Sequence, residues 1–166
     1  LGSPDSASIM ERGFDWSKSR AFGLGINSLY LNLRGRERYG VVEPGREREG
    51  LLDELAARLV AVRDRDGRQV IRAVHRADKV YGGSAMRYAP DLIIGYSRDF
   101  RASWKTVLGD MSDEVMLDNP SAWGADHCMD ASEVPGVLFS NRPIAAPQPS
   151  LVDLAPSILA GFGLDI

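Results

Sequence analysis

The chain is poor in the residues that carry metal and redox chemistry, with one cysteine and two histidines among 166 residues. The single cysteine, Cys128, excludes a disulfide within the chain. It fits a reducing compartment, which favours the cytoplasm slightly and leaves the location otherwise unknown. A stable zinc site needs three or four donors, and two histidines cannot supply such a cluster of imidazole ligands. A metal site built by this chain alone is therefore not expected.

Long apolar runs and an excess of basic charge are also absent. No stretch approaches the roughly 18 apolar residues that a membrane helix needs, so we expect no membrane span. The formal charge of -3, from 20 basic and 23 acidic residues, offers nothing to attract nucleic acid. The densest basic cluster comprises Arg34, Arg36 and Arg38, and Glu37 interrupts it. This pattern favours a solvated turn over a nucleic-acid patch.

The standard nucleotide and hydrolase motifs are missing. Residues 23–25 (Gly-Leu-Gly) lack the third glycine of a dinucleotide loop and lie inside a strand-like run. There is no Walker loop, no GxSxG elbow and no HExxH sequence. Residues 64–67 (Asp-Arg-Asp-Gly) resemble the start of a calcium loop, but Val70 and Arg72 occupy later ligand positions. A turn that ends a helix is the better interpretation of this stretch.

Hydrophobic periodicity predicts an α/β fold with a mixed sheet flanked by helices. The apolar content of 44% is sufficient for one domain with a sizeable core. Apolar residues alternate across positions 21–33, which predicts one or two strands broken near Asn27-Ser28. Helical spacing of leucines predicts a helix over 46–63. A strand and its exit are predicted over 69–81. Short buried strands are predicted over 91–96 and 134–139, the second broken at Pro135-Gly136.

The rest of the chain is predicted to be a lead-in, a long loop and a closing helix. Residues 1–14 show no clear period and are expected to form a loose lead-in. Residues 104–130 are polar and weakly periodic, and a loop of this length is more often functional than idle. Residues 150–163 are predicted to be a helix with a capping box between Ser150 and Asp153, and Pro156 in its first turn.

The two histidines differ in their surroundings. His75 lies in a strand-like stretch with no carboxylate beside it, which favours a structural or surface role over catalysis. His127 follows Asp126 in a glycine-containing loop ahead of an apolar run, as a metal ligand at a sheet edge would. Ligation of one ion by His127, Cys128 and Asp130 together is disfavoured because adjacent residues point in different directions. Cys128 is expected to be a small buried residue.

Several short motifs, taken in order, resemble the C-terminal part of bacterial type I phosphodiesterase/nucleotide pyrophosphatase-like proteins of the alkaline-phosphatase superfamily. The resemblance spans about residues 15–164, and the ordered combination is more specific than any single motif. In chain order the matching motifs are Asp15-Trp16-Ser17-Lys18-Ser19-Arg20-Ala21, Tyr30-Leu31-Asn32-Leu33-Arg34-Gly35-Arg36-Glu37, Val42-Glu43-Pro44-Gly45, Val80-Tyr81-Gly82, Ala89-Pro90-Asp91-Leu92, Trp123-Gly124-Ala125-Asp126-His127 and Val152-Asp153-Leu154-Ala155-Pro156-Ser157-Ile158-Leu159.

The resemblance implies that residues 15–166 are the C-terminal portion of one alkaline-phosphatase-like catalytic domain, a sandwich with a mixed sheet. Such enzymes hold two divalent cations, usually zinc, and a Thr, Ser or Cys nucleophile attacks the phosphoryl group. The late histidine ligand of the family matches His127. The early Asp, the nucleophile and the remaining Asp and His ligands normally lie upstream, and no residue here matches them. The chain also has Gly124-Ala125 where the superfamily commonly has Ser-Gly.

Other residues have weaker expectations. Asp126 could orient His127 or a water, with a loop-capping carboxylate as the alternative, and Asn119 is expected to help shape the same loop. Lys18 and Arg20 could contact phosphate, although an exposed turn is favoured for both. Arg34 and Arg36 could bind a ligand or form salt bridges. Tyr81 and Tyr96 are expected to pack.

The resemblance predicts a hydrolase whose parent cleaves phosphate esters and whose isolated C-terminal part is inactive, with no catalytic residue of its own. Its partners would be a small phosphate-ester substrate and the missing N-terminal portion. The alternative is a non-catalytic α/β binding or structural module that kept the fold and lost the chemistry. A chain that lacks part of its sheet also exposes strand edges, so a homo-oligomer is a third expectation.

Overall fold

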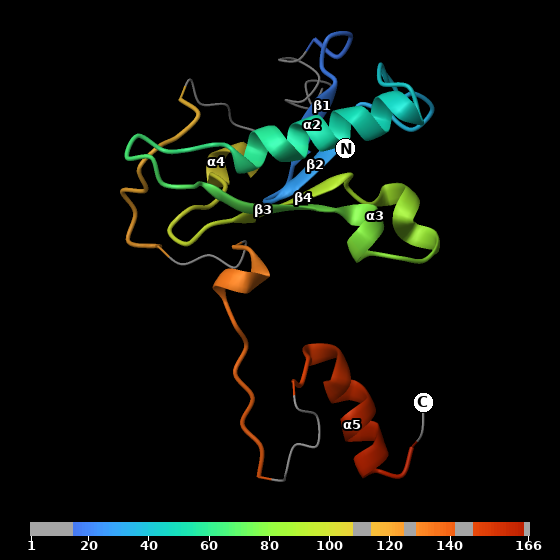
Figure 1. Ribbon diagram of the computed structural model, residues 1–166, viewed down its shortest axis with the longest axis vertical. Coiled ribbons are helices and arrows are strands. Elements are labelled where there is room, and N and C mark those ends of the chain that lie inside the picture. The colour runs from blue at the N-terminus through green and yellow to red at the C-terminus, as the bar shows by residue number, and fades with distance from the viewer. Residues whose placement is uncertain (1–14, 108–113, 125–128, 142–147, 165–166) are drawn as a thin grey trace, which may run out of the picture. The chain divides into compact units, whose positions relative to one another are not determined.

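A computed structural model describes residues 15–107, 114–124, 129–141 and 148–164 of the chain. The chain divides into two compact units, one ending at Pro135 and the other beginning at Gly136. The first unit contains the sheet and the second contains a short helical segment (Figure 1). None of the helices in the described ranges has the length and apolarity that a bilayer crossing requires.

The sheet has four antiparallel strands in the order β1-β2-β4-β3. Strands β1 (Ala21–Leu24) and β2 (Ser28–Leu31) form the hairpin that the alternating apolar residues predict. Gly25, with φ of 72°, supplies the left-handed conformation of the turn between them. Strand β4 (Leu92–Tyr96) pairs with β2 on one side and with β3 (Ile71–Arg76) on the other.

The α/β class is confirmed, but the prediction of a mixed sheet is wrong for the strands that the structure describes. All of their pairings are antiparallel, and parallel pairing occurs there only as isolated bridges, such as Tyr96 with Met129. The connection from β2 through α2 to β3 is long enough to make these two strands parallel neighbours. β4 instead inserts between them and pairs antiparallel with both.

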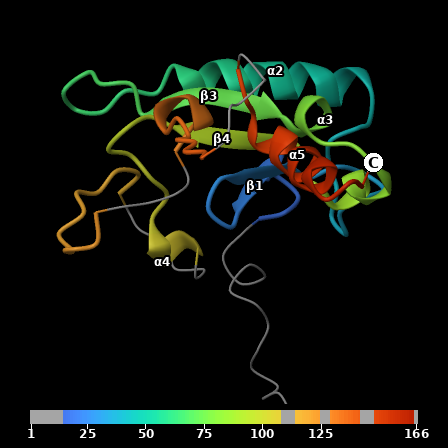
Figure 2. The same ribbon diagram turned by 90° about the horizontal axis from the view of Figure 1, so that it is seen from below.

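Helix α2 (Arg46–Val60) packs on one face of the sheet (Figures 1 and 2). The predicted helix over 46–63 is confirmed, although it ends three residues earlier. The early end has a local cause: Arg63 forms a bridge with Gln69, so the chain is already returning toward β3. The residues of the core come from the sheet, the loop before the helix, and the helix itself: Leu31, Val42, Leu51, Leu52 and Leu92.

The strand predicted within 69–81 is present as Ile71–Arg76, and its exit follows. The chain then turns into the four-residue helix α3 (Ala77–Val80) and the 3-10 helix η1 (Ser84–Tyr88). The N–H of Ala77 donates to the Asp91 carbonyl, which extends the β3–β4 pairing by one residue. The N–H of Tyr81 donates back to the Ala77 carbonyl and closes the turn of α3. Tyr81 consequently lies 52% exposed instead of packing as expected.

The predicted buried strand over 134–139 is wrong. This stretch has no strand pairing in the part of the chain that is described, and Phe139 is 91% exposed. Pro135 lacks a backbone N–H and Gly136 has no side chain to pack, so an apolar run containing both is a poor strand. Short helical turns flank this region and the preceding loop: α4 (Trp104–Val107) and η2 (Ala131–Glu133).

The second unit contains the closing helix that the sequence predicts. It consists of the 3-10 turn η3 (Leu151–Asp153) followed by α5 (Leu154–Gly161). The expected capping box is present, and the Asp153 carboxylate accepts the Ser150 N–H at 2.7 Å. Pro156 lies in the first turn of α5, where its missing N–H is tolerated.

Candidate functional site

The carboxyl end of β4 is joined by the segment that follows the long loop. Tyr96, the last residue of β4, forms a parallel bridge with Met129. Its carbonyl accepts the N–H of Asp130 at 2.9 Å. Residues 129–133 therefore lie against the end of a central strand. We call these five residues the β4 clasp.

Asp130 is the central side chain of the β4 clasp and is 6% exposed. One carboxylate oxygen accepts from the Ser132 N–H at 3.0 Å and from the Ser132 hydroxyl at 2.6 Å. The other lies 2.7 Å from Nε2 of His75. The Ser132 hydroxyl lowers the pKa of Asp130 most; burial opposes this effect, and His75 adds to it. Together they bring the pKa to about 2. The carboxylate is therefore ionised at neutral pH.

Gly95 leaves the space that Asp130 occupies. A Cβ placed on Gly95 would lie 2.8 Å from Cβ and 2.9 Å from Cγ of Asp130, and closer still to its Oδ2. Real side chains almost never approach so closely, so a glycine is required here while Asp130 keeps its position. An isolated glycine inside a strand often marks such a close approach of another segment.

A second charged contact holds the other end of the β4 clasp. The Arg72 guanidinium lies 3.2 Å from a carboxylate oxygen of Glu133. Arg72 and His75 both belong to β3, so the clasp reaches across the end of β4 to the neighbouring edge strand. Glu133 is the less exposed partner, with 24% of its side chain accessible against 53% for Arg72.

The position of His75 differs from the sequence-based expectation. The sequence shows no carboxylate beside His75, but the fold brings Asp130 to it from 55 residues away. The side chain of His75 is still 46% exposed, so the surface part of the expectation holds. The signal that could have found this pair is the isolated Gly95 within an otherwise bulky strand. An imidazole whose Nε2 is bound to a carboxylate can be oriented for proton transfer or ligation through Nδ1.

The predicted metal ligand lies outside the described residues. His127 belongs to residues 125–128, together with Asp126 and Cys128. Within the described ranges, no group of three or more His, Cys, Asp or Glu side chains is arranged to hold a metal ion. Asp130, the nearest described acidic residue in sequence, already binds Ser132 and His75. The metal prediction for His127 therefore stays a prediction.

Asn119 shapes the loop before residue 125, as expected. Its amide nitrogen donates to the Trp123 carbonyl at 2.8 Å, and its amide oxygen accepts from the Ser121 N–H and hydroxyl. These bonds close a turn over residues 119–123, which precedes the segment that contains His127.

The two residues considered as phosphate contacts, Lys18 and Arg20, are in ion pairs. Lys18 lies 3.1 Å from Asp15, and its side chain is 84% exposed. Arg20 pairs with Glu47, Arg34 pairs with Glu43, and Arg36 pairs with its neighbour Glu37 and with the distant Asp91. The salt-bridge alternative considered for Arg34 and Arg36 is thus confirmed, and Lys18 lies in the exposed turn that was favoured for it.

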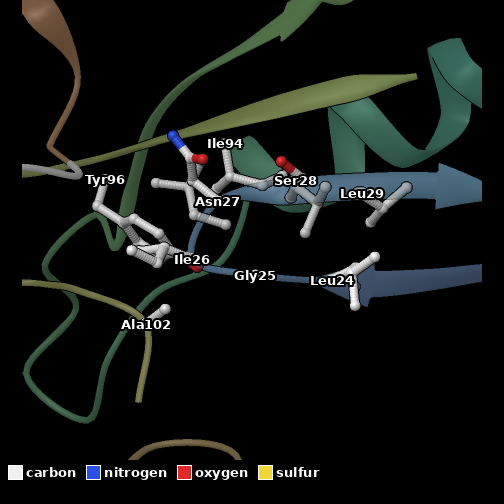
Figure 3. Close-up of a pocket in the computed structure, with 12 residues that line it drawn as sticks. Leu24, Gly25, Ile26, Asn27, Ser28, Leu29, Ile94, Tyr96 and Ala102 are labelled. Carbon is white, nitrogen blue, oxygen red and sulfur yellow. The ribbon is translucent and has the colours of Figure 1, made fainter. Parts of the chain in front are cut away.

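A pocket of about 250 Å³ lies beside the β1–β2 turn (Figure 3). Tyr96 and Ile94 of β4 contribute to its wall, and so does Leu59 at the end of α2. Asn27 in the turn and Ser28 at the start of β2 are polar lining residues. Among the described residues, the lining contains no carboxylate, histidine or basic side chain. It suits a small apolar group.

Replacing Gly95 with alanine is expected to displace Asp130 and lower the free energy of unfolding by about 1–3 kcal/mol, the usual range for overpacking. The physical reason is the overlap of the new methyl group with the Asp130 side chain. Urea unfolding followed by circular dichroism measures the change. The matched control is Gly50→Ala in α2, where a Cβ meets no atom within 4 Å.

That control should stabilise the chain by about 0.5–1 kcal/mol, because alanine is the better helix former. Equal behaviour of the two variants would show that Asp130 does not pack against Gly95.

Comparison of the chain with protein-family models, curated proteins and solved structures gives no match.

Proposed function

We propose that this chain is the C-terminal part of a metal-dependent phosphoesterase of the phosphodiesterase/nucleotide pyrophosphatase type, with an alkaline-phosphatase-like sandwich as the complete fold. In this proposal His127 supplies one ligand to a pair of divalent cations, with zinc as the expected metal. The nucleophile and the other ligands come from sequence outside the chain. The substrate is a small phosphate ester.

The observation that carries the proposal is the pairing of Met129 with Tyr96 at the carboxyl end of β4. Ligands in open, mostly parallel α/β sheets gather at the carboxyl ends of strands. In this antiparallel sheet the support comes from β4 alone, the strand that pairs with Met129, and His127 precedes Met129 by two residues in the sequence. The ordered motifs from residue 15 to residue 164 support the same function through their resemblance to the family.

The chemistry expected of the chain follows from its donors. Asp130 is engaged by Ser132 and His75 and is therefore not a free ligand. One imidazole alone binds zinc weakly, because stable sites use three or four protein donors. The bound metals would stabilise the attacking oxygen and the charge on the phosphoryl group. The role of this chain is then to hold one imidazole at the metal site.

The proposal predicts that the isolated chain binds zinc weakly through His127 and does not hydrolyse bis-p-nitrophenyl phosphate. Zinc affinity is measured by competition with a chromogenic chelator. The His127→Ala variant should lose this binding, whereas His75→Gln should keep it. The two variants are matched, because each removes one of the only two imidazoles in the chain.

The stronger test uses the same two variants in the chain extended by its natural upstream sequence. Hydrolysis of the diester should appear there, and His127→Ala should lower kcat/KM by at least about 100-fold, since even outer-shell changes at metal sites lower activity 10–100-fold. Diester hydrolysis by the isolated chain would refute the need for residues outside it. Full activity of the extended His127→Ala variant would refute the assigned ligand.

A further inference from the structure

We propose that the β4 clasp is a proton-dependent latch: the imidazolium of His75 holds residues 129–133 on the sheet more tightly than the neutral imidazole does. This inference does not rest on the phosphoesterase proposal, because every residue that takes part in it lies in the described part of the chain.

Asp130 makes most of the contacts between the clasp and the sheet that are described above. Asp130 is bound by its backbone to Tyr96, packs over Gly95, and reaches His75 at 2.7 Å. A neutral imidazole can donate one hydrogen bond to this ionised carboxylate, and that bond is already charge-assisted. A protonated imidazole adds the Coulomb attraction between two opposite charges in contact.

Among the described residues, the charged groups next to His75 lie on β3 and on the clasp, with their partners. Strand β3 carries Arg72, which pairs with Glu133 in the clasp, and Arg76, which pairs with Glu49 of α2. Strand β4, over Leu92–Tyr96, contributes no charged side chain. The clasp contributes Asp130 and Glu133. The carboxylate that faces the ring is therefore Asp130, while the neighbouring arginines have partners of their own.

The sign of the effect follows from which group changes charge. Asp130 stays ionised down to strongly acidic pH, so over the neutral range the carboxylate is constant. Histidine is the side chain whose charge ordinarily changes between pH 5 and 8. Protonation of the imidazole places a positive charge 2.7 Å from this fixed negative one. The latch should therefore be tighter at the lower pH.

Two backbone amides report the state of the latch directly. The Asp130 N–H donates to the Tyr96 carbonyl, and the Ser132 N–H donates to the Asp130 carboxylate. Hydrogen exchange followed by NMR on the 166-residue chain gives their protection factors at pH 5.5 and 7.5, each relative to the intrinsic exchange rate at that pH. We expect both amides to be about threefold more protected at pH 5.5, a modest factor because the ring is partly exposed and screened by solvent.

The Asn32 N–H is the internal reference, because it donates to the Arg20 carbonyl beside the β1–β2 hairpin, and neither of these strands pairs with β3 or the clasp. Its protection should not change between the two pH values. A parallel change at Asn32 would show that the whole fold responds to pH and would overturn the latch.

Three variants separate the imidazole from its surroundings. His75→Gln keeps a neutral donor near the position of Nε2, so the amides should remain protected while the pH difference disappears. His75→Ala should reduce protection at both pH values. His127→Gln, which removes the only other imidazole, should leave the pH difference intact. Persistence of the pH difference in His75→Gln, or its loss in His127→Gln, would overturn the proposal.

Discussion

Replacing Asp91 with alanine is expected to lower the free energy of unfolding by about 3–5 kcal/mol, the usual penalty for removing one partner of a buried ion pair. The Asp91 side chain is 1% exposed and is bound by two guanidinium groups. Arg36 lies 2.5 Å from one carboxylate oxygen, and Arg48 lies 3.0 Å from the other. The Leu31 N–H also donates to this carboxylate, at 2.8 Å.

The size of the expected effect comes from what the variant leaves behind. Arg36 and Arg48 are each less than one quarter exposed, so both charges would remain partly buried after losing their shared partner. These arginines come from the loop after β2 and from helix α2, while Asp91 precedes β4. The carboxylate therefore ties three parts of the first unit together. Its loss should loosen the packing of α2 on the sheet.

Urea unfolding monitored by far-ultraviolet circular dichroism measures the change. The matched control is Glu54→Ala on the exposed side of α2, which breaks an i,i+4 pair with Arg58. Such exposed pairs contribute about 0–1 kcal/mol. A loss of less than about 1 kcal/mol for Asp91→Ala would show that Asp91 does not stabilise the fold through these contacts, because removing one partner of a buried ion pair ordinarily costs more.

The parts of the fold that were predictable from the sequence depend on local patterns. The alternation in 21–33 gives β1 and β2, the leucine spacing after Pro44 gives α2, and the short apolar run at 91–96 gives β4. Each of these signals needs only neighbouring residues, since a helix or strand buries one face at a fixed period. The capping box at Ser150 is local for the same reason.

The parts that were not predictable depend on pairings between distant residues. Asp91 meets Arg36 across 55 positions, and His75 meets Asp130 across another 55. No local period marks such partners. The sequence pattern therefore predicts neither the arginines that bind Asp91 nor the carboxylate that binds His75. Residues 134–139 show the opposite error: the apolar content suggested a strand, while Pro135 and Gly136 opposed it locally.

Replacing Asn32 with aspartate is expected to lower the free energy of unfolding at pH 7 by about 3–5 kcal/mol, because it removes the donor that three backbone carbonyls share and introduces a buried charge. Asn32 is 0% exposed. Its amide nitrogen lies 2.9–3.0 Å from the carbonyl oxygens of Trp16, Ser19 and Tyr39. A carboxylate of the same shape would place an oxygen against those three oxygens.

The amide oxygen of Asn32 is also informative. It is buried without a hydrogen-bond partner among the described residues. Neither oxygen of an aspartate at this position would therefore find a donor there. The buried carboxyl group should take up a proton, since desolvation disfavours its charged form and raises its pKa. The protonated form still has a single O–H in place of the two amide hydrogens.

The pH dependence distinguishes this mechanism from a simple loss of packing. The folded-state pKa of the new carboxyl group would be raised above its unfolded value of about 3.9. The variant is then least destabilised below pH 4, and the deficit relative to the wild-type chain grows as the pH rises toward 7. Urea unfolding of both proteins between pH 4 and pH 7 measures this growth.

Asn32→Ala is the matched variant, because it removes the same donor without adding a titratable group. Its free energy of unfolding should be about 1–3 kcal/mol below that of the wild-type chain, the usual penalty for leaving hydrogen-bonding groups without their partner. This difference should not vary with pH. If the aspartate variant showed the same pH-independent deficit as alanine, its carboxyl group would be reaching solvent. The loops at 15–20 and 37–41 would then be held by their own backbone bonds and not by the Asn32 amide.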